Sequence, residues 1–311
     1  MIGHFGAGYS AREEHFDQDG TNIAMTSTPW GQLLALTPLL PWSLACAAAM
    51  GAEHTAGSAV RWADRRLNLM AGAWVLLAIF FCQVLLMMLF TLVYKVVRPI
   101  HFPIALDRGY PGAVVVGGLS WVVLYDFAYY MFHRAQHRFA WLWRFHAVHH
   151  SDTAMNATTY ARQHVLESVF QSVLILFPML LLFRLSPATA LVVGLISAAL
   201  QFWIHADVRV HYGRWSAVLV SPLQHRWHHN RDQRQREANF AGVFPWIDVL
   251  LGTYRAPDPH TRIDTGLFDG TTWGDMLGLL TADPAARRVI ETPVTEAHDM
   301  PGLSRTPGAD Q

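Results

Sequence analysis

The stretch FHAVHHSD, residues 145–152, contains the pattern His-x-x-His-His with an aspartate shortly after it. The pattern returns in QHRWHHNRD, residues 224–232, and HRAQH, residues 133–137, carries two histidines at His-x3-His spacing. On a helix, residues three or four positions apart share a face. The three stretches therefore predict three helical patches that direct eight imidazoles at a common site: His133, His137, His146, His149, His150, His225, His228 and His229.

The composition of the chain indicates a membrane protein. Of the 311 residues, 52% are hydrophobic and only 15% are charged, whereas soluble domains carry about 25% charged residues. A formal net charge of zero offers no electrostatic argument for a nucleic-acid partner. The two cysteines lie in apolar surroundings, which argues against a disulfide framework and against a cysteine-based metal site.

Long apolar runs predict membrane-spanning helices, since a helix needs about 20 apolar residues to cross a bilayer. We expect about four, at Leu69–Tyr94, Tyr110–Phe132, Leu166–Phe183 and Pro187–Ile204. The last two runs are separated only by RLS, which predicts a hairpin over 166–204. An earlier apolar run at 33–50 contains two prolines, and it either crosses the membrane or lies in the interface.

The order of these runs places all the histidine patches on one membrane face. His133 follows the second run, and the hairpin returns the chain to the same side at His205, before the third patch. The segments on this side hold most of the arginines, and excess positive charge marks the cytoplasmic side. We therefore expect an all-α integral membrane helical bundle with a cytosolic-face helical cap that carries a histidine-rich dimetal site.

The chain divides into four parts on this interpretation. Residues 1–30 form an acidic leader that lacks the apolar core of a signal peptide and is predicted to be disordered. Residues 31–109 hold the N-terminal membrane segments, and residues 110–255 form the catalytic domain with the histidine patches and the hairpin. Residues 256–311 form a polar C-terminal tail.

Eight imidazoles exceed the four ligands of a tetrahedral zinc ion. They fit two metal ions, each held by several imidazoles with a position left open. Imidazole binds iron, copper, zinc and nickel, so the type of ligand does not identify the metal. A lone histidine is usually a surface or core residue, and we assign that role to the histidines that lie far from the three patches.

The motifs resemble the fatty acid hydroxylase/sterol desaturase superfamily of integral-membrane di-iron enzymes. The resemblance runs from about Tyr110 to Tyr254 and is carried by DFAYYMFHRAQH at 126–137, WRFHAVHHSD at 143–152 and SPLQHRWHHNRD at 221–232. It implies two iron ions, dioxygen as co-substrate, and hydroxylation or desaturation of a lipid C–H bond. It implies no catalytic side chain beyond the metal ligands. The lipid stays open among sterol, fatty acyl chain, ether lipid and carotenoid.

An electron donor must be a separate molecule on this interpretation. The sequence has no glycine-rich dinucleotide fingerprint and no cysteine cluster for iron–sulfur. A row of arginines beside the third patch is interpreted either as a docking site for an acidic donor or as a contact for phospholipid headgroups.

Two further histidines are candidate ligands. His205 leaves the last membrane helix on the metal side, and His164 lies within RQH after the second patch. At position 207 the family often has asparagine, whereas this chain has Asp207, whose carboxylate would change either the ligation or the hydrogen bonding beside the metals.

Buried carboxylates are expected to orient the ligands, because a ligating imidazole donates its other N–H to a carboxylate or a carbonyl. Asp126 lies two helical turns before His133 on the same face, and Glu167 follows RQH. Asp152 and Asp232 are interpreted either as further such partners or as helix caps.

Two other classes of protein stay open. A zinc-dependent membrane hydrolase would need a glutamate base, as in His-Glu-x-x-His, and that motif is missing from the sequence. A non-enzymatic metal or haem carrier would place single histidines inside membrane helices, whereas these histidines are clustered at predicted helix ends.

Overall fold

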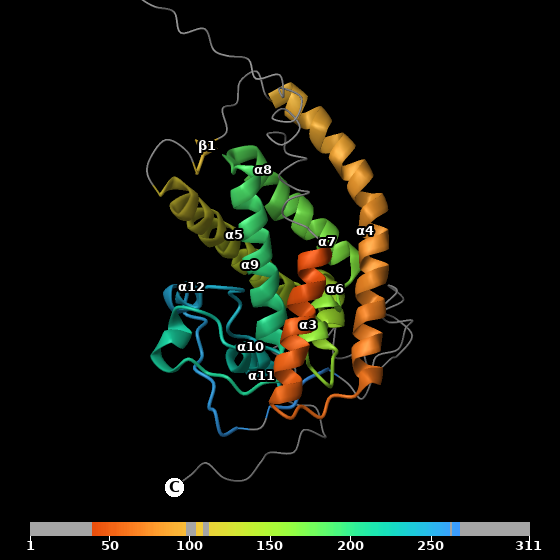
Figure 1. Cartoon of the computed structure of the whole chain (residues 1–311), viewed down its shortest axis with the longest axis vertical. Helices are drawn as coiled ribbons and strands as arrows, with labels where there is room; N and C mark the ends of the chain where they lie inside the picture. The colour runs from red at the N-terminus through yellow and green to blue at the C-terminus, as the bar shows by residue number, and fades with distance from the viewer. Residues whose placement is uncertain (1–38, 98–103, 108–111, 262, 268–311) are drawn as a thin grey trace, which may run out of the picture.

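The computed structural model describes residues 39–97, 104–107, 112–261 and 263–267. The predicted leader 1–30 and most of the predicted tail 256–311 lie outside the described residues. In the described part the fold is helical, as the apolar runs predicted, apart from a short pair of parallel strands (Figure 1). These strands are β1 (Ile104–Ala105) and β2 (Phe183–Arg184).

Long helices form the body of the molecule, and short helices form a cap at one end (Figure 1). The helices of the body are α3 (Leu39–Thr55), α4 (Trp62–Val97), α5 (Ala113–Arg138), α6 (Ala140–His150), α7 (Val165–Gln171), the π-helical η3 (Ser172–Leu176), α8 (Phe177–Leu182) and α9 (Pro187–His205). The short elements are η2 (Ala157–Ala161), η4 (Gly213–Ala217), α10 (Pro222–His228), α11 (Gln233–Arg236) and α12 (Trp246–Leu250).

Three helices in the described part are long and apolar enough to cross a membrane: Ala113–Arg138, Val165–Leu182 and Pro187–His205. They correspond to three of the four predicted crossings. The fourth predicted run, Leu69–Tyr94, lies within the 36-residue helix α4, and its crossing stays a prediction. The earlier run at 33–50 begins outside the described residues and continues into α3.

Apolar side chains point outward from the candidate spans and inward to a core between them. Val115 on α5 and Ile196 on α9 are more than half exposed, which suits helices that face lipid. Trp121, Ile175 and Val193 belong to a buried cluster that joins α5, η3 and α9. This packing brings together the C-terminal ends of α5 and α9 and the N-terminal end of α7, and we call these the histidine end of the bundle.

The chain after α9 forms the cap over the histidine end. Asp126 on α5 accepts hydrogen bonds from the backbone N–H groups of Gly242, Val243 and Phe244, at distances from 2.7 to 3.2 Å. Asp248 accepts two further backbone bonds from the same loop. These hydrogen bonds hold the loop that follows α11 against α5, about two helical turns before His133.

Candidate metal centre

Nine buried histidines form two adjacent groups in the described part of the chain. Within each group, one nitrogen atom from every ring lies within 4.8 Å of the others. The first imidazole group consists of His133, His137, His146, His150 and His228, and the second of His149, His205, His225 and His229. The eight histidines of the three sequence patches are all included, and so is His205.

Each His-x-x-His-His triplet contributes to both groups. On α6, His146 and His150 belong to the first imidazole group and His149 to the second. The triplet that begins on α10 is divided the other way, because His228 belongs to the first group and the two remaining histidines belong to the second. The triplet on α6 therefore gives two histidines to the first group and one to the second, and the triplet that begins on α10 gives one and two.

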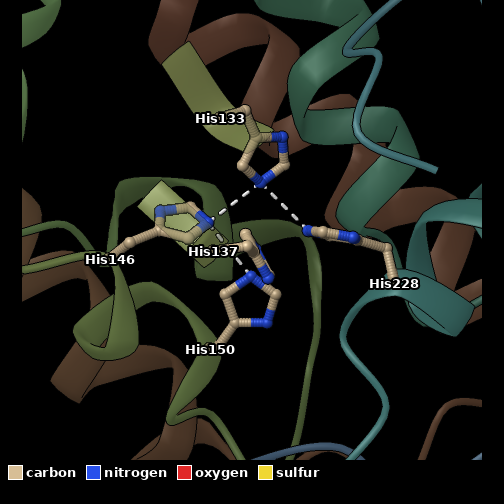
Figure 2. Close-up of side chains that lie close together, drawn as sticks. All are labelled: His133, His137, His146, His150 and His228. Atoms are coloured by element: carbon tan, nitrogen blue, oxygen red, sulfur yellow. Dashed lines mark hydrogen bonds between the residues drawn. The ribbon is translucent and has the colours of Figure 1, made fainter. Parts of the chain in front are cut away.

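The first imidazole group is assembled from three helices. Figure 2 shows His133 of α5 above, His146 and His150 of α6 at the left and below, and His228 of α10 at the right, with His137 of α5 between them. The Nε2 atom of His133 lies 2.9 Å from that of His146 and 3.0 Å from that of His228. The Nε2 atoms of His146 and His150 are 3.1 Å apart.

Backbone carbonyls determine which nitrogen of several rings carries the proton. Nδ1 of His133 donates to the carbonyl of Phe240 at 2.7 Å, and Nδ1 of His228 donates to that of Ala238 at 2.8 Å. In the second group, Nδ1 of His205 donates to Gln201 at 2.7 Å and Nδ1 of His149 to Arg162 at 3.2 Å. A carbonyl oxygen only accepts, so each Nε2 atom is left with a lone pair.

These lone pairs face one another inside each group. His133 and His228 present two acceptor nitrogens 3.0 Å apart, and His205 and His149 present two more at 3.1 Å. Two buried acceptors without a proton between them repel, and a cation that binds both removes the repulsion. Two nitrogens at about 2.1 Å from one metal are about 3.0 Å apart at a right angle and about 3.4 Å apart at a tetrahedral angle. The observed spacing is short enough for one metal ion to bind both nitrogens of each pair.

Other ring nitrogens are also left without a partner in the described residues. They are Nε2 of His137, Nδ1 of His150, Nδ1 of His225 and Nε2 of His229. Unpaired polar atoms at full burial are costly, because they lose their hydrogen bonds to water without compensation. A metal ion in each group would supply a partner to Nε2 of His137 and to Nε2 of His229, so the residues present fit a two-metal centre.

Burial keeps these imidazoles in the form that binds metal. Loss of hydration lowers the pKa of His149 to about 4 and the pKa of His228 to about 3. It also lowers the pKa of His150, His225 and His229 well below the usual value. These rings are neutral at neutral pH, and a neutral imidazole has the free lone pair that a metal requires.

Glu167 has the contacts expected for a carboxylate that orients a ligand. It lies on the first turn of α7, and its Oε1 atom accepts from Nδ1 of His146 at 2.7 Å and from the amide of Gln136 at 3.0 Å. A second such carboxylate was not predicted. Glu237, after α11, has Oε1 at 3.4 Å from Nδ1 of His137, and nothing in its sequence surroundings marks it.

Asp126 has no described hydrogen bond to an imidazole, and its role beside the metal ligands stays a prediction. All its described hydrogen bonds go to the loop 242–244. It nevertheless acts one step away, because this loop continues from Phe240, whose carbonyl holds His133.

Two other candidates have local structural contacts instead of contacts to the imidazole groups. His164 lies outside both groups in the described structure; its Nδ1 accepts from the backbone N–H of Leu166 at 3.1 Å and caps α7. Asp207 pairs with Arg226 at 2.9 Å and accepts from Ser58 at 2.7 Å. Their roles as a metal ligand and as a modifier of the metal surroundings stay predictions.

The remaining two aspartates, Asp152 and Asp232, have their described hydrogen bonds with groups other than the imidazoles. Asp232 caps α11 through the N–H of Arg234 at 2.9 Å. Asp152 is buried and accepts from the side chains of Asn68 and Thr159 at 2.7 and 2.6 Å.

Three helices that could cross a membrane and two groups of imidazoles at their histidine end define the class: a candidate membrane protein with a candidate histidine-rich metal centre. Residues 118–253 match the family described as fatty acid hydroxylase. Over these residues, which make up less than half of the chain, the protein is similar to that family. The match covers α5 through α12 and includes every histidine of the two groups.

Three known proteins of lipid metabolism are similar to parts of this chain. The chain is 30% identical to the ornithine lipid hydroxylase OlsE of Rhizobium tropici over 54% of this chain and 50% of the relative. It is 35% identical to human alkylglycerol monooxygenase over 42% of this chain and 29% of the relative. It is 27% identical to a Delta(7)-sterol 5(6)-desaturase of Aspergillus fumigatus over 49% of this chain and 52% of the relative. The chain thus spans about half or less of the length of these relatives. No solved structure matches significantly.

Proposed function

We propose that the protein is a membrane-bound, non-haem di-iron oxygenase that hydroxylates a lipid with dioxygen and electrons from an external donor. The observation that carries this proposal is the two pairs of facing Nε2 atoms, one pair in each imidazole group. Similarity to proteins named as a lipid hydroxylase, a monooxygenase and a desaturase supports iron and oxygen chemistry at such a centre.

The first imidazole group would hold one iron ion and the second imidazole group the other. When bound, the two ions supply the reduction of dioxygen that oxidises a lipid C–H bond. The overall reaction consumes one dioxygen, two electrons and two protons, converts the C–H group into C–OH, and reduces the second oxygen atom to water. Desaturation of the same lipid is the alternative outcome.

The chain's own residues prepare this chemistry by orientation and by exclusion of water. The carbonyls of Phe240 and Ala238 and the carboxylate of Glu167 hold the rings in one tautomer and one direction. All nine histidines are buried, which keeps bulk water away from an oxidant that would otherwise react unproductively.

The position of the centre indicates which part of a lipid would react. His133 and His137 lie in the last two turns of α5, and His205 is the last residue of α9. The centre is therefore at the end of the candidate spans, at the depth where lipid headgroups lie, and we place this end on the cytoplasmic side. A lipid in its usual orientation presents there the carbons close to its headgroup. We propose a polar lipid with an acyl or alkyl chain, attacked near the headgroup.

The test combines metal analysis with isotopic labelling of the product. The full chain, purified in detergent, should contain about two iron ions per molecule. Cells that produce it under ¹⁸O₂ should contain a lipid with one added ¹⁸O atom, and cells that produce the His149→Ala variant should lack it. Zinc with oxygen-independent turnover would instead indicate a hydrolase, and a haem Soret band would indicate a haem carrier. Either result would refute the proposal.

A further inference from the structure

Helix α4 lies outside the segment that matches the family, yet it contributes a fully buried polar side chain to the surroundings of the metal centre. Asn68 has 0% exposure and contacts the segment between α6 and α7. We propose that Asn68 is a positioning residue for the second imidazole group and acts through Arg162 on His149. The inference rests on the proposed function, since it assumes that this group holds an iron ion.

The side-chain amide of Asn68 contacts a buried cation and a buried anion at the same time. Its Oδ1 atom accepts from Nη1 of Arg162 at 3.0 Å, and its Nδ2 atom donates to Oδ2 of Asp152 at 2.7 Å and to Oγ1 of Thr158 at 3.2 Å. Arg162 is 3% exposed and Asp152 is 4% exposed. Charged groups that are buried this deeply need hydrogen-bond partners, because an unpaired charged group in the interior costs more free energy than one at the surface. An amide is suited to this place, since it offers an acceptor and a donor.

Arg162 connects this amide to the ligand. Its backbone carbonyl accepts from Nδ1 of His149 at 3.2 Å and so directs the Nε2 atom of that ring at His205. Its guanidinium also binds the carbonyl of Val148 at 3.3 Å and the hydroxyl of Ser151 at 3.1 Å, on either side of the His149–His150 pair. A shift of Arg162 would therefore change first the orientation of His149, whose ring bonds to the Arg162 carbonyl.

The approach of α4 to this segment is close along one face of the helix. Gly72 lies one turn after Asn68, and a Cβ atom at Gly72 would come within 2.7 Å of the Cβ atom of Ala161. Ala71 packs against Val148 in a small buried cluster. The absence of a side chain at Gly72 lets α4 approach closely enough for the Asn68 amide to reach Arg162.

A charge exchange between positions 68 and 152 tests the proposal. Asn68→Asp would place two carboxylates side by side in the protein interior and remove the donor to Asp152. We expect this variant to lose about half of its iron, because only the second imidazole group is disturbed. The double variant Asn68→Asp/Asp152→Asn restores a donor opposite an acceptor and leaves a carboxylate against Arg162. Oγ1 of Thr159 loses its acceptor at position 152, so we expect the variant to regain most of the wild-type iron content.

The measurements are iron per chain and the ligand-field spectrum of the Co²⁺-loaded protein, each on the full chain in detergent. Asp107→Asn is the matched control, because it alters a buried carboxylate that accepts from the N–H of Ser186. Asp107 lies two residues after β1, which is at the opposite end of the bundle (Figure 1). We expect this control to keep both metal ions and the wild-type spectrum. Gly72→Ala serves as a second variant if Asn68→Asp does not fold, and it should show the same loss of about half the iron with the amide intact.

The outcomes separate this inference from the proposed function. If the wild-type chain binds no iron, the proposed function is wrong. If the wild-type chain binds about two iron ions and Asn68→Asp or its substitute Gly72→Ala does so too, with unchanged cobalt spectra, the role of Asn68 is refuted and the function stands. Failure of the double variant to regain iron would also refute the role of Asn68. That result would indicate a general packing defect, which the charge exchange does not repair.

Discussion

The Nε2 atom of His133 lies 3.0 Å from the Nε2 atom of His228, which follows 95 residues later in the chain. Both rings have their Nδ1 protons engaged by backbone carbonyls, so two lone pairs face each other at full burial. The folded protein without metal must bear this repulsion. A bound cation turns the same contact into a source of stability.

Removal of metal should therefore lower the thermal stability of the protein. A ligand present at about 100 times its Kd stabilises the native state by about 2.7 kcal/mol. Because two ions are lost, chelation of the purified protein should lower Tm by several degrees, and addition of Fe²⁺ without oxygen should restore it. Thermal unfolding followed by circular dichroism provides the measurement.

The variant His133→Ala is the control for that experiment, since it removes one of the two facing lone pairs. Its Tm should respond less to chelation than the Tm of the wild-type chain. An equal response in both would show that the stabilising metal binds elsewhere.

Loss of one ligand from either group should empty one metal site and spare the other. His150→Ala affects the first imidazole group, and His229→Ala affects the second, although the two rings stack with centroids 4.3 Å apart. We expect each variant to retain about half of the wild-type iron and to lose hydroxylation by at least about 100-fold, because the proposed reaction needs both ions. Iron content and product lipid are measured on the same preparation.

His164→Ala is the comparison for these ligand variants. Its ring caps α7 and lies outside both groups, so the variant should keep the full iron content and lose about 1 kcal/mol of stability, as typical for a lost helix cap. Loss of half the iron in His164→Ala would instead support the ligand role predicted from its sequence position.

Glu167→Gln should weaken the first metal site without removing a ligand. The carboxylate accepts from Nδ1 of His146 at 2.7 Å, and loss of its charge makes the imidazole a weaker base toward the metal. We expect a loss of about 10- to 100-fold in metal affinity or activity. A competition titration with a coloured chelator measures the affinity.

Asp126→Asn gives the contrasting result for a carboxylate that holds only backbone. Its hydrogen bonds to the loop 242–244 contribute to folding, so this variant should unfold more easily, with a cost of about 1–3 kcal/mol. Its iron affinity in the folded state should stay close to that of the wild-type chain. Equal losses of iron affinity in the Glu167 and Asp126 variants would show that the two carboxylates do not differ in their effect on the metal site.

Helical periodicity explains why the eight patch histidines could be identified in advance. Spacings of three and four residues place imidazoles on one helix face whatever the neighbouring helices are. The same rule does not say which partner that face meets. It placed Asp126 on the same face as His133, and the carboxylate accepts from the backbone of the loop 242–244.

The sequence of this protein by itself determined its apolar helices, the clustering of its histidines and its resemblance to a lipid-oxidising superfamily, because these depend on composition and short-range spacing. Only the tertiary structure decided how each triplet is divided between two groups, that His205 completes the second group, and that Asn68 on a distant helix supports His149. Those relationships depend on where α4, α6, α9 and α10 lie against one another, and contacts between residues far apart in the chain have no signature in local spacing.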